Sequence, residues 1–407
     1  GKIASGFAGI VIGSNATNYS GAINQDYTLA SFTFTSPLTI QSNSGTITTA
    51  DTLNTGTNSL TISSGGAVSL AAITSGTLAI TGTGITLNGN VTTTGTQTYT
   101  GAVTLGASVT LTGTGITTSS TVAASNYSLT LVTDALALGA AVNGGTGTLT
   151  IKPKTATTTI GLGTGASSGT LNLNNTELGY INTASNNFAS LVIGDATNGT
   201  GAITYNTNST TISFGSNLTL QQKSTGDGIT LNNSITTTGS QTYTGAVKLS
   251  AGITLTTTSN GAVSFSSTLN NSTATARALT ISTGSGDVTF TGAIGGDATN
   301  GAIGAIDVSS TGITAFGSTV KAASVTTNTG GTTTLAGNVT TTGTQTYNDA
   351  VTLLGTSITL SSSGGADATN QAITFSSTLN GSTSDGSKAL TINAGSGIVT
   401  FTGAVGN

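Results

Sequence analysis

Few side chains in this sequence could do chemistry, and carboxylates are the commonest of them. The chain has one Glu, Glu177, one Arg, Arg277, and no His or Cys, and its Asp residues are scattered singly. Enzymes that cleave polysaccharides need clustered carboxylates, often beside a basic residue or a cation. Glu177 and Arg277 are far apart in the sequence. We therefore predict that the chain is not an enzyme and has no catalytic residue.

One segment could bind calcium, because GSGDVTF at 284–290 resembles a turn of a glycine- and aspartate-rich repeat. Its own copy later in the chain reads GSGIVTF, where Ile398 stands in place of Asp287. A site made by stacked loops fails when one carboxylate has no neighbour in register. Three further Asp residues share a position in a recurring turn sequence: Asp195, Asp297 and Asp367. Such corners favour Asp for backbone hydrogen bonds alone, so we predict no metal and no cofactor.

The composition excludes several other classes. Charged residues make up 5% of the 407 residues, and the net charge of −4 leaves no basic surface that could bind nucleic acid. No stretch is apolar for long enough to span a membrane, and the first residues lack the pattern of a signal peptide. The absence of Cys rules out disulfides.

The elements that would position any site repeat along the chain. GNVTTTGTQTYTGAVTL at 89–105 returns as NSITTTGSQTYTGAVKL at 233–249 and as GNVTTTGTQTYNDAVTL at 337–353. Apolar and Thr residues alternate within it, as in a strand with one buried face. The spacing predicts inward Val91, Tyr99, Val103 and Leu105, outward Thr residues, and turns at Gly95 and Gly101.

Pairs of apolar residues two apart recur along the chain at steps of about 20 residues, often halved; they include Leu129/Leu131, Leu149/Ile151, Leu171/Leu173 and Leu191/Ile193. This pattern predicts an all-β fold, a right-handed parallel β-helix with about 20 residues per coil. We expect residues 1–407 to form one continuous solenoid, an elongated rod on the order of 100 Å long. At LNLNNTELGYI, Asn175 or Thr176 is expected to cap a helical turn that carries Glu177.

The sequence also contains repeats that are longer than one coil. Residues 7–40 align with 188–220, and residues 261–296 align with 371–407. The chain is therefore expected to begin and end inside repeat units. Uncovered strand edges at such places would be relieved by continuation in a longer chain or by association with neighbours, end to end or laterally.

Thr-x-Thr runs suggest ice binding as an alternative function, because flat ladders of Thr hydroxyl and methyl groups can bind the ordered water of an ice surface. The runs at Thr96–Thr100 and Thr236–Thr242 lie in coils far apart in sequence, so we expect no continuous array. Tyr99, Tyr243 and Tyr347 are also far apart in sequence, by 144 and 104 residues. We expect them to form no common aromatic ladder and to occupy the same place in different coils.

The repeated GNVTTTGTQTYTGAVTL elements, the run at 290–339 and the segment at 170–194 resemble the repeat regions of large secreted bacterial adhesins of the filamentous haemagglutinin type. The resemblance covers the whole chain. It implies a right-handed β-helix at the bacterial cell surface or outside the cell, acting in attachment, biofilm or filament formation. We expect a structural fibre or adhesin stalk; the alternative within the fold is an adhesin face that binds a glycan.

Overall fold

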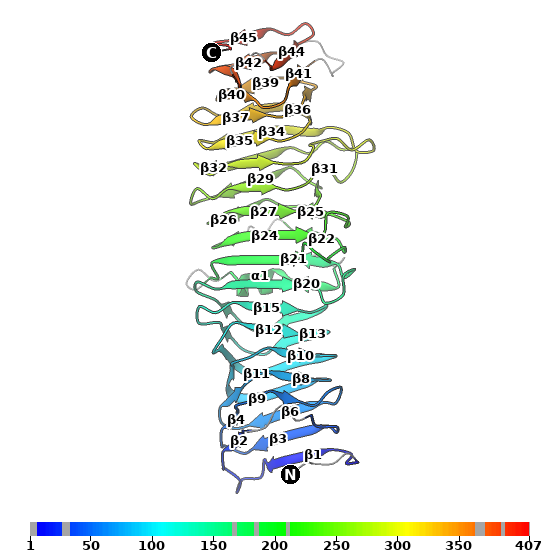
Figure 1. Cartoon of the computed structure of the whole chain (residues 1–407), viewed down its shortest axis with the longest axis vertical. Helices are drawn as coiled ribbons and strands as arrows, with labels where there is room; N and C mark the ends of the chain where they lie inside the picture. Colours follow the sequence, from blue (N-terminus) through cyan, green and yellow to red (C-terminus); the bar gives the residue numbers. More distant parts are fainter. Residues whose placement is uncertain are drawn as a thin grey trace. The chain divides into compact units, whose positions relative to one another are not determined.

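The computed structural model describes residues 6–26, 33–164, 169–182, 187–208, 212–362, 371–383 and 387–406. Within these residues the chain forms 45 short strands and one helix (Figure 1). The strands of successive coils pair in parallel, so the predicted all-β parallel β-helix is confirmed. The right-handed winding and the rod shape stay predictions.

The chain divides into two compact units. Unit 1 comprises residues 1–163 and 167–194, and unit 2 comprises residues 164–166 and 195–407. The single continuous solenoid therefore also stays a prediction, and each unit is described by itself.

Three stacks of parallel strands make up most of unit 1. The first contains β1 (Ile10–Ser14), β3 (Leu38–Ser42), β6 (Leu60–Ser64), β9 (Leu78–Leu87), β11 (Thr96–Leu105), β13 (Gly115–Thr118) and β16 (Leu136–Leu138). The second contains β2 (Ile23–Gln25), β4 (Ile47–Thr49), β7 (Val68–Leu70), the C-terminal halves of β9 and β11, β14 (Val122–Ala123) and β17 (Val142–Asn143). The third contains β5 (Leu53–Asn54), β8 (Ile73–Ser75), β10 (Val91–Thr93), β12 (Val109–Thr112), β15 (Leu129–Val132), β18 (Thr148–Lys152) and β21 (Ser190–Asp195).

Unit 2 repeats this plan. Its first stack contains β24 (Asn217–Gln222), β27 (Gln241–Thr244), β30 (Val263–Phe265), β33 (Val288–Phe290), β35 (Ile313–Phe316), β37 (Thr332–Leu335), β40 (Ala350–Leu353) and β43 (Leu379–Gly381). Its second contains β23 (Ser213–Phe214), β26 (Ile235–Thr237), β29 (Ile253–Thr257), β32 (Leu279–Gly284), β34 (Ile303–Ser310), β36 (Val320–Thr327), β39 (Gln345–Tyr347), β42 (Ile373–Phe375) and β45 (Val399–Phe401). Its third contains β22 (Ile203–Tyr205), β25 (Ile229–Leu231), β28 (Val247–Leu249), β31 (Leu269–Asn271), the N-terminal half of β36, β38 (Val339–Thr341), β41 (Ser357–Ser361) and β44 (Ala389–Asn393).

The register of the pairs confirms the coil length. Val109 pairs with Leu129, and Leu129 pairs with Leu149, so two successive coils each advance the chain by 20 residues. The next partner in this stack is Leu191, because a longer coil intervenes. That coil holds β19 (Ile160–Leu162), β20 (Leu171–Leu173) and α1 (Asn175–Tyr180).

Alternation within each strand places apolar side chains inside the coil. In β18, for example, Leu149 and Ile151 are buried, whereas Thr148, Thr150 and Lys152 remain partly exposed. Burying each such side chain contributes about 1.5–3 kcal/mol. The short strands therefore depend on the coils above and below them for stability.

Two local predictions are corrected. The cap of α1 is Asn174, not Asn175 or Thr176, and it forms a capping box with Glu177. Gly95 lies in the bend between β10 and β11, as predicted, but Gly101 lies inside β11. Its φ of +132° and the register shift between Thr100 and Ala102 mark a bulge. A side chain at residue 101 would meet the carbonyl oxygen of Gly82, which explains the Gly.

Candidate functional site

The residues with catalytic potential have structural roles. Glu177 is buried, and its Oε2 accepts a hydrogen bond from the backbone N–H of Asn174 at 3.0 Å. Its Oε1 accepts from the backbone N–H of Leu138 at 3.1 Å, which attaches α1 to β16. Glu177 is therefore a buried structural residue and not a solvent-exposed one. Arg277, in unit 2, donates from its backbone N–H to Asn271 Oδ1.

The Asp residues considered for calcium bond to backbone N–H groups. Asp287 Oδ1 accepts from Ile313 N at 2.7 Å, which joins one corner to the next coil. Asp195 and Asp297 each accept from the two backbone N–H groups that follow in their own turns. In Asp297, the backbone hydrogen bonds from Thr299 and Asn300 lower the pKa of the carboxyl group below its usual value. Asp367 lies outside the described residues.

The parts of the chain that the structure describes contain no group of three His, Cys, Asp or Glu side chains placed to hold a metal. In the same parts no helix is both long and apolar enough to cross a membrane.

Thr residues form a more regular outward column than the sequence indicated. On the second stack of unit 2, one position in seven successive coils holds Thr254, Thr280, Asp307, Thr326, Thr346, Thr374 and Thr400. The column is one residue wide, is interrupted by Asp307 and includes no residue of the runs at Thr96–Thr100 and Thr236–Thr242, so the expectation that those runs form no continuous array stays a prediction. Such a column fits an exposed strand face and by itself identifies no ligand.

A polar arrangement that sequence reasoning missed lies inside the coils. In all three motif copies, the Gln that precedes the Tyr by two positions is buried; these residues are Gln97, Gln241 and Gln345. In the first copy, Gln97 Nε2 donates to the carbonyl oxygen of Thr112 in the next coil at 2.8 Å. The Tyr99 hydroxyl donates to Gln97 Oε1 at 2.8 Å. We call each such pair a Gln–Tyr clamp.

The other two Gln–Tyr clamps have the same bonds. Gln241 Nε2 donates to the carbonyl oxygen of Thr256 at 3.0 Å, and Gln345 Nε2 donates to that of Ser361 at 2.9 Å. Tyr243 and Tyr347 donate to the Gln of their own pair at 2.8 and 3.0 Å. Burial raises the pKa of each Tyr well above its usual value. The signal in the sequence was the unchanged Q-T-Y of all three copies.

The Tyr residues also correct a prediction. Tyr243 lies in β27 of the first stack of unit 2, whereas Tyr347 lies in β39 of the second stack. They therefore do not occupy the same place in their coils. Each begins a ladder of stacked rings with centroid separations of 4.9–5.3 Å: Tyr243, Phe265, Phe290 and Phe316 in one, and Tyr347, Phe375 and Phe401 in the other.

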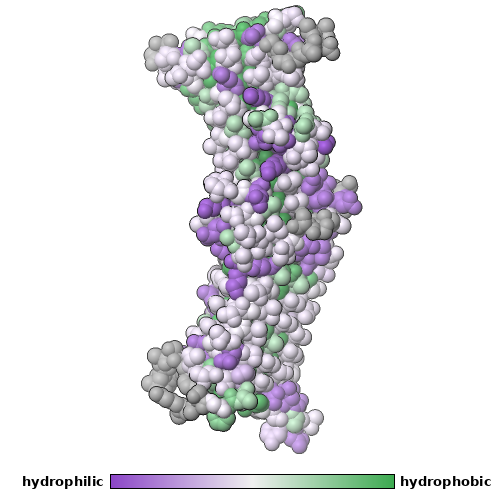
Figure 2. Space-filling view, turned by 90° about the vertical axis from the view of Figure 1, so that its right-hand side faces the viewer, coloured by the Kyte–Doolittle hydropathy of each residue, from purple (hydrophilic) through white to green (hydrophobic). Residues whose placement is uncertain are grey.

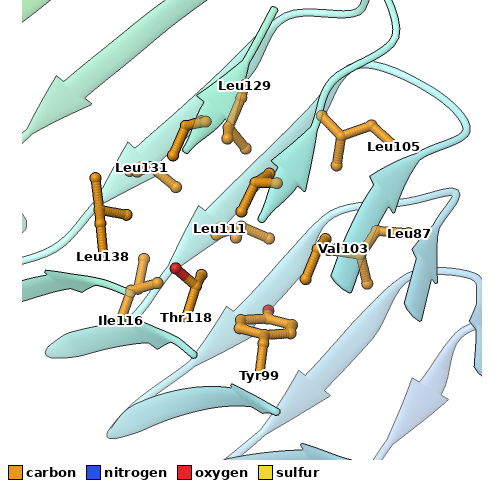
Figure 3. A pocket seen from close by; sticks show the side chains of 12 residues that line it. Leu87, Tyr99, Val103, Leu105, Leu111, Ile116, Thr118, Leu129, Leu131 and Leu138 are labelled. Atoms are coloured by element: carbon orange, nitrogen blue, oxygen red, sulfur yellow. The ribbon is translucent and has the colours of Figure 1, made fainter. Parts of the chain in front are cut away.

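Tyr99 in unit 1 has a different environment. It borders an apolar cavity of about 10 Å³ into which Leu111, Leu131 and Leu138 also point (Figure 3). The Oγ1 atom of Thr118, which also lines the cavity, is buried without a hydrogen-bond partner. The cavity is at the lower limit for one water molecule and could not hold a larger ligand.

The exposed surface with the clearest chemical character is the last coil of unit 2. The inward side chains of its strands are uncovered: Val399 is 38% exposed, Phe401 43% and Val405 55%. Figure 2 shows hydrophobic atoms gathered along the upper rim of the molecule, where this coil lies in Figure 1.

Searches against protein-family models, curated proteins and solved structures find no match to the chain.

Proposed function

We propose that this chain is a section of an extracellular structural fibre or adhesin stalk, which acts as a spacer and does not catalyse a reaction. The observation that carries the proposal is the coil-by-coil construction. In each unit, one coil bonds to the next through parallel strands, and the interior contains apolar side chains and Gln–Tyr clamps; unit 2 also contains two aromatic ladders. Each coil in such an array is stabilised mainly by its two neighbours, so further coils can be added with the same kinds of contact.

The surface supports the same function. Outward strand positions carry mostly Thr, Ser and Asn, which stay in water without large charge repulsion between neighbouring molecules. The carboxylates with catalytic or metal-binding potential are used in turns and caps, as described above. The location outside a bacterial cell rests on the resemblance of the repeats to those of secreted adhesins.

Length is the property of a stalk that can be tested. Residues 109–148 comprise two coils whose ends are in register, since Val109, Leu129 and Leu149 are successive partners. Extra copies of this block inserted after residue 148 should lengthen the chain by about 4.8 Å per coil. Single copies would be displayed on bacterial cells between a membrane anchor and a terminal epitope tag.

The expected result is a narrow distribution of distances between gold-labelled tag and membrane in electron micrographs, increasing linearly with the number of added coils. Retention of the cells under flow on a surface coated with antibody against the tag should persist across the series. A broad distribution that grows with the square root of length would indicate a flexible chain and contradict the proposal. So would a distance that does not change with added coils.

A further inference from the structure

The connections between the second and third stacks of unit 1 differ in length. Three of them comprise residues 71–72, 88–90 and 106–108, whereas the next two comprise residues 124–128 and 144–147. The two longer connections lie on successive coils, because β14 pairs in parallel with β17. This widened corner contains a cleft of about 240 Å³, which we call the corner cleft; it is lined by Ala123, Ser125, Asn126, Asn143, Gly144 and Gly145.

The backbone at Ser125 is the unusual feature of this corner. Ser125 and Asn126 have φ values of +52° and +72°, and the Tyr127 N–H closes the turn on the carbonyl oxygen of Ala124 at 2.8 Å. Every other described residue with positive φ is Gly or Asn, the two types that tolerate this conformation best. Because side chains held in such a conformation concentrate at functional sites, Ser125 indicates that its hydroxyl group has a function in the cleft.

Hydrogen bonds between the two coils hold the cleft in shape. The Asn126 N–H donates to the carbonyl oxygen of Gly144 at 3.1 Å, and Asn126 Oδ1 accepts from the Thr146 N–H at 3.0 Å. A side chain at residue 145 would meet Asn126 Oδ1, so Gly145 allows this close contact. A cleft that is preorganised in this way loses little conformational entropy when a ligand binds.

The polar groups of the cleft that can contact a ligand are neutral. Ser125 and Asn126 are exposed, and within the described part of the chain neither the Ser125 hydroxyl nor Asn126 Nδ2 forms a hydrogen bond. No charged side chain lines the cleft. A hydroxyl group and an amide both match the hydroxyl groups of a sugar, since they can donate and accept hydrogen bonds.

The size of the cleft limits its ligand. Sites for drug-sized molecules have volumes of roughly 300–1,000 Å³, so the corner cleft fits a smaller group, such as one sugar ring. Gly144 and Gly145 have no side chain and let such a ring approach the backbone.

We propose that the corner cleft binds one neutral sugar residue at the end of a glycan. Ser125 and Asn126 form hydrogen bonds to the hydroxyl groups of the sugar, and Gly144 and Gly145 lie beneath its ring. An acidic sugar would find no ion-pair partner among the lining residues. This inference goes beyond the proposed stalk function, because a spacer needs no ligand.

Two variants of the full 407-residue chain remove the contacts, Ser125→Gly and Asn126→Gly. Gly adopts positive φ without strain, so both variants keep the turn, and Ser125→Gly should be at least as stable as the unmodified chain. The matched control is Asn260→Gly in unit 2. Asn260 has a φ of +58°, and its Oδ1 accepts from the Ser285 N–H at 3.0 Å, so this control loses the same kind of bond as Asn126→Gly outside the cleft.

Binding is measured first on an array of neutral, sialylated and sulfated glycans, with the biotinylated chain held on streptavidin to raise its avidity. The unmodified chain and Asn260→Gly should bind at least one glycan with a neutral terminal sugar, and high salt should not weaken this binding. Saturation-transfer NMR with the methyl glycoside of that sugar then gives affinities. Ser125→Gly and Asn126→Gly should each bind about tenfold more weakly.

Three results would overturn the proposal: no binding to any neutral glycan, binding to acidic glycans alone, or an unchanged affinity in both cleft variants. Circular dichroism checks that each variant is folded, and the expected stability of Ser125→Gly separates loss of the hydroxyl group from loss of structure. None of these results bears on the stalk itself, because the display experiment above needs no glycan.

Discussion

Tyr99 in unit 1 and Tyr243 in unit 2 occur in nearly identical sequences but in different surroundings. Both belong to Gln–Tyr clamps with the same hydrogen bonds. The coil after Tyr243 places Phe265 on its ring at 4.9 Å, whereas the coil after Tyr99 places Thr118 at the paired position, beside a cavity. The motif therefore fixes its own polar contacts, and the neighbouring coil decides how well the ring is packed.

The largest expected effect is at the middle of the ladder in unit 2. Phe290→Ala removes a fully buried ring that stacks on Phe265 and Phe316, and it should lower the local free energy of unfolding by about 3–5 kcal/mol. Hydrogen exchange, followed by mass spectrometry of peptides from β30 to β35, would measure the loss. Peptides of unit 1 serve as the internal control and should be unchanged. Equal loss in both units would show that the array unfolds as one body.

The Gln–Tyr clamps of the two units should contribute nearly equally to the local free energy of unfolding. Gln97→Leu and Gln241→Leu each leave a buried Tyr hydroxyl without its acceptor and a carbonyl of the next coil without this donor. Each should cost about 2–4 kcal/mol of local unfolding free energy in hydrogen exchange.

The double variant Gln241→Leu with Tyr243→Phe is the control, because it also removes the stranded hydroxyl and should recover part of the loss. A large difference between Gln97→Leu and Gln241→Leu would mean that the ring packing, and not the clamp, sets the cost.

The same comparison separates what the sequence could predict from what it could not. Doublets such as Leu149/Ile151 predict the strands and the coil length, because burial requires apolar residues at every second position and stacking repeats them. The inward position of Gln97 escapes this reasoning. Its acceptor is the carbonyl of Thr112, on the next coil, so one copy of the motif does not reveal the partner, and the only signal is the unchanged Q-T-Y of all three copies.

The stack on which each motif copy lies could not be predicted from the sequence for a related reason. A coil has three strands, so a motif can begin on any stack and keep the same local structure. Tyr243 and Tyr347 accordingly lie on different stacks of unit 2.

The third motif copy adds a pH dependence that the first two lack. Asp349 stands where they have Gly101 and Gly245, and burial raises its pKa, although hydrogen bonds from Gly331 N and Thr333 oppose the rise. A raised carboxyl pKa means that the folded state holds the proton to higher pH than the unfolded state does. Stability should therefore fall as pH increases from the unfolded pKa through the folded one.

Denaturant unfolding between pH 3 and pH 8, roughly the range in which carboxyl groups titrate, would show this. Asp349→Asn should remove the slope due to this residue, and Asp287→Asn, which changes a carboxyl in the same unit, should leave it in place. An unchanged slope in Asp349→Asn would contradict the assignment.

The smallest expected effect is at the cavity beside Tyr99. Thr118→Val replaces a buried hydroxyl that has no partner by a methyl group, and it should stabilise unit 1 by about 1 kcal/mol in hydrogen exchange of β11 to β16. Thr117→Val, on the outward side of β13, is the control and should change stability by less than about 0.5 kcal/mol. Loss of stability in Thr118→Val would instead indicate that a water molecule bonds to this hydroxyl, since the cavity is at the size limit for one. The packing defect beside Tyr99 would then be a hydrated site, and the difference between the two units would be one of solvent as well as of packing.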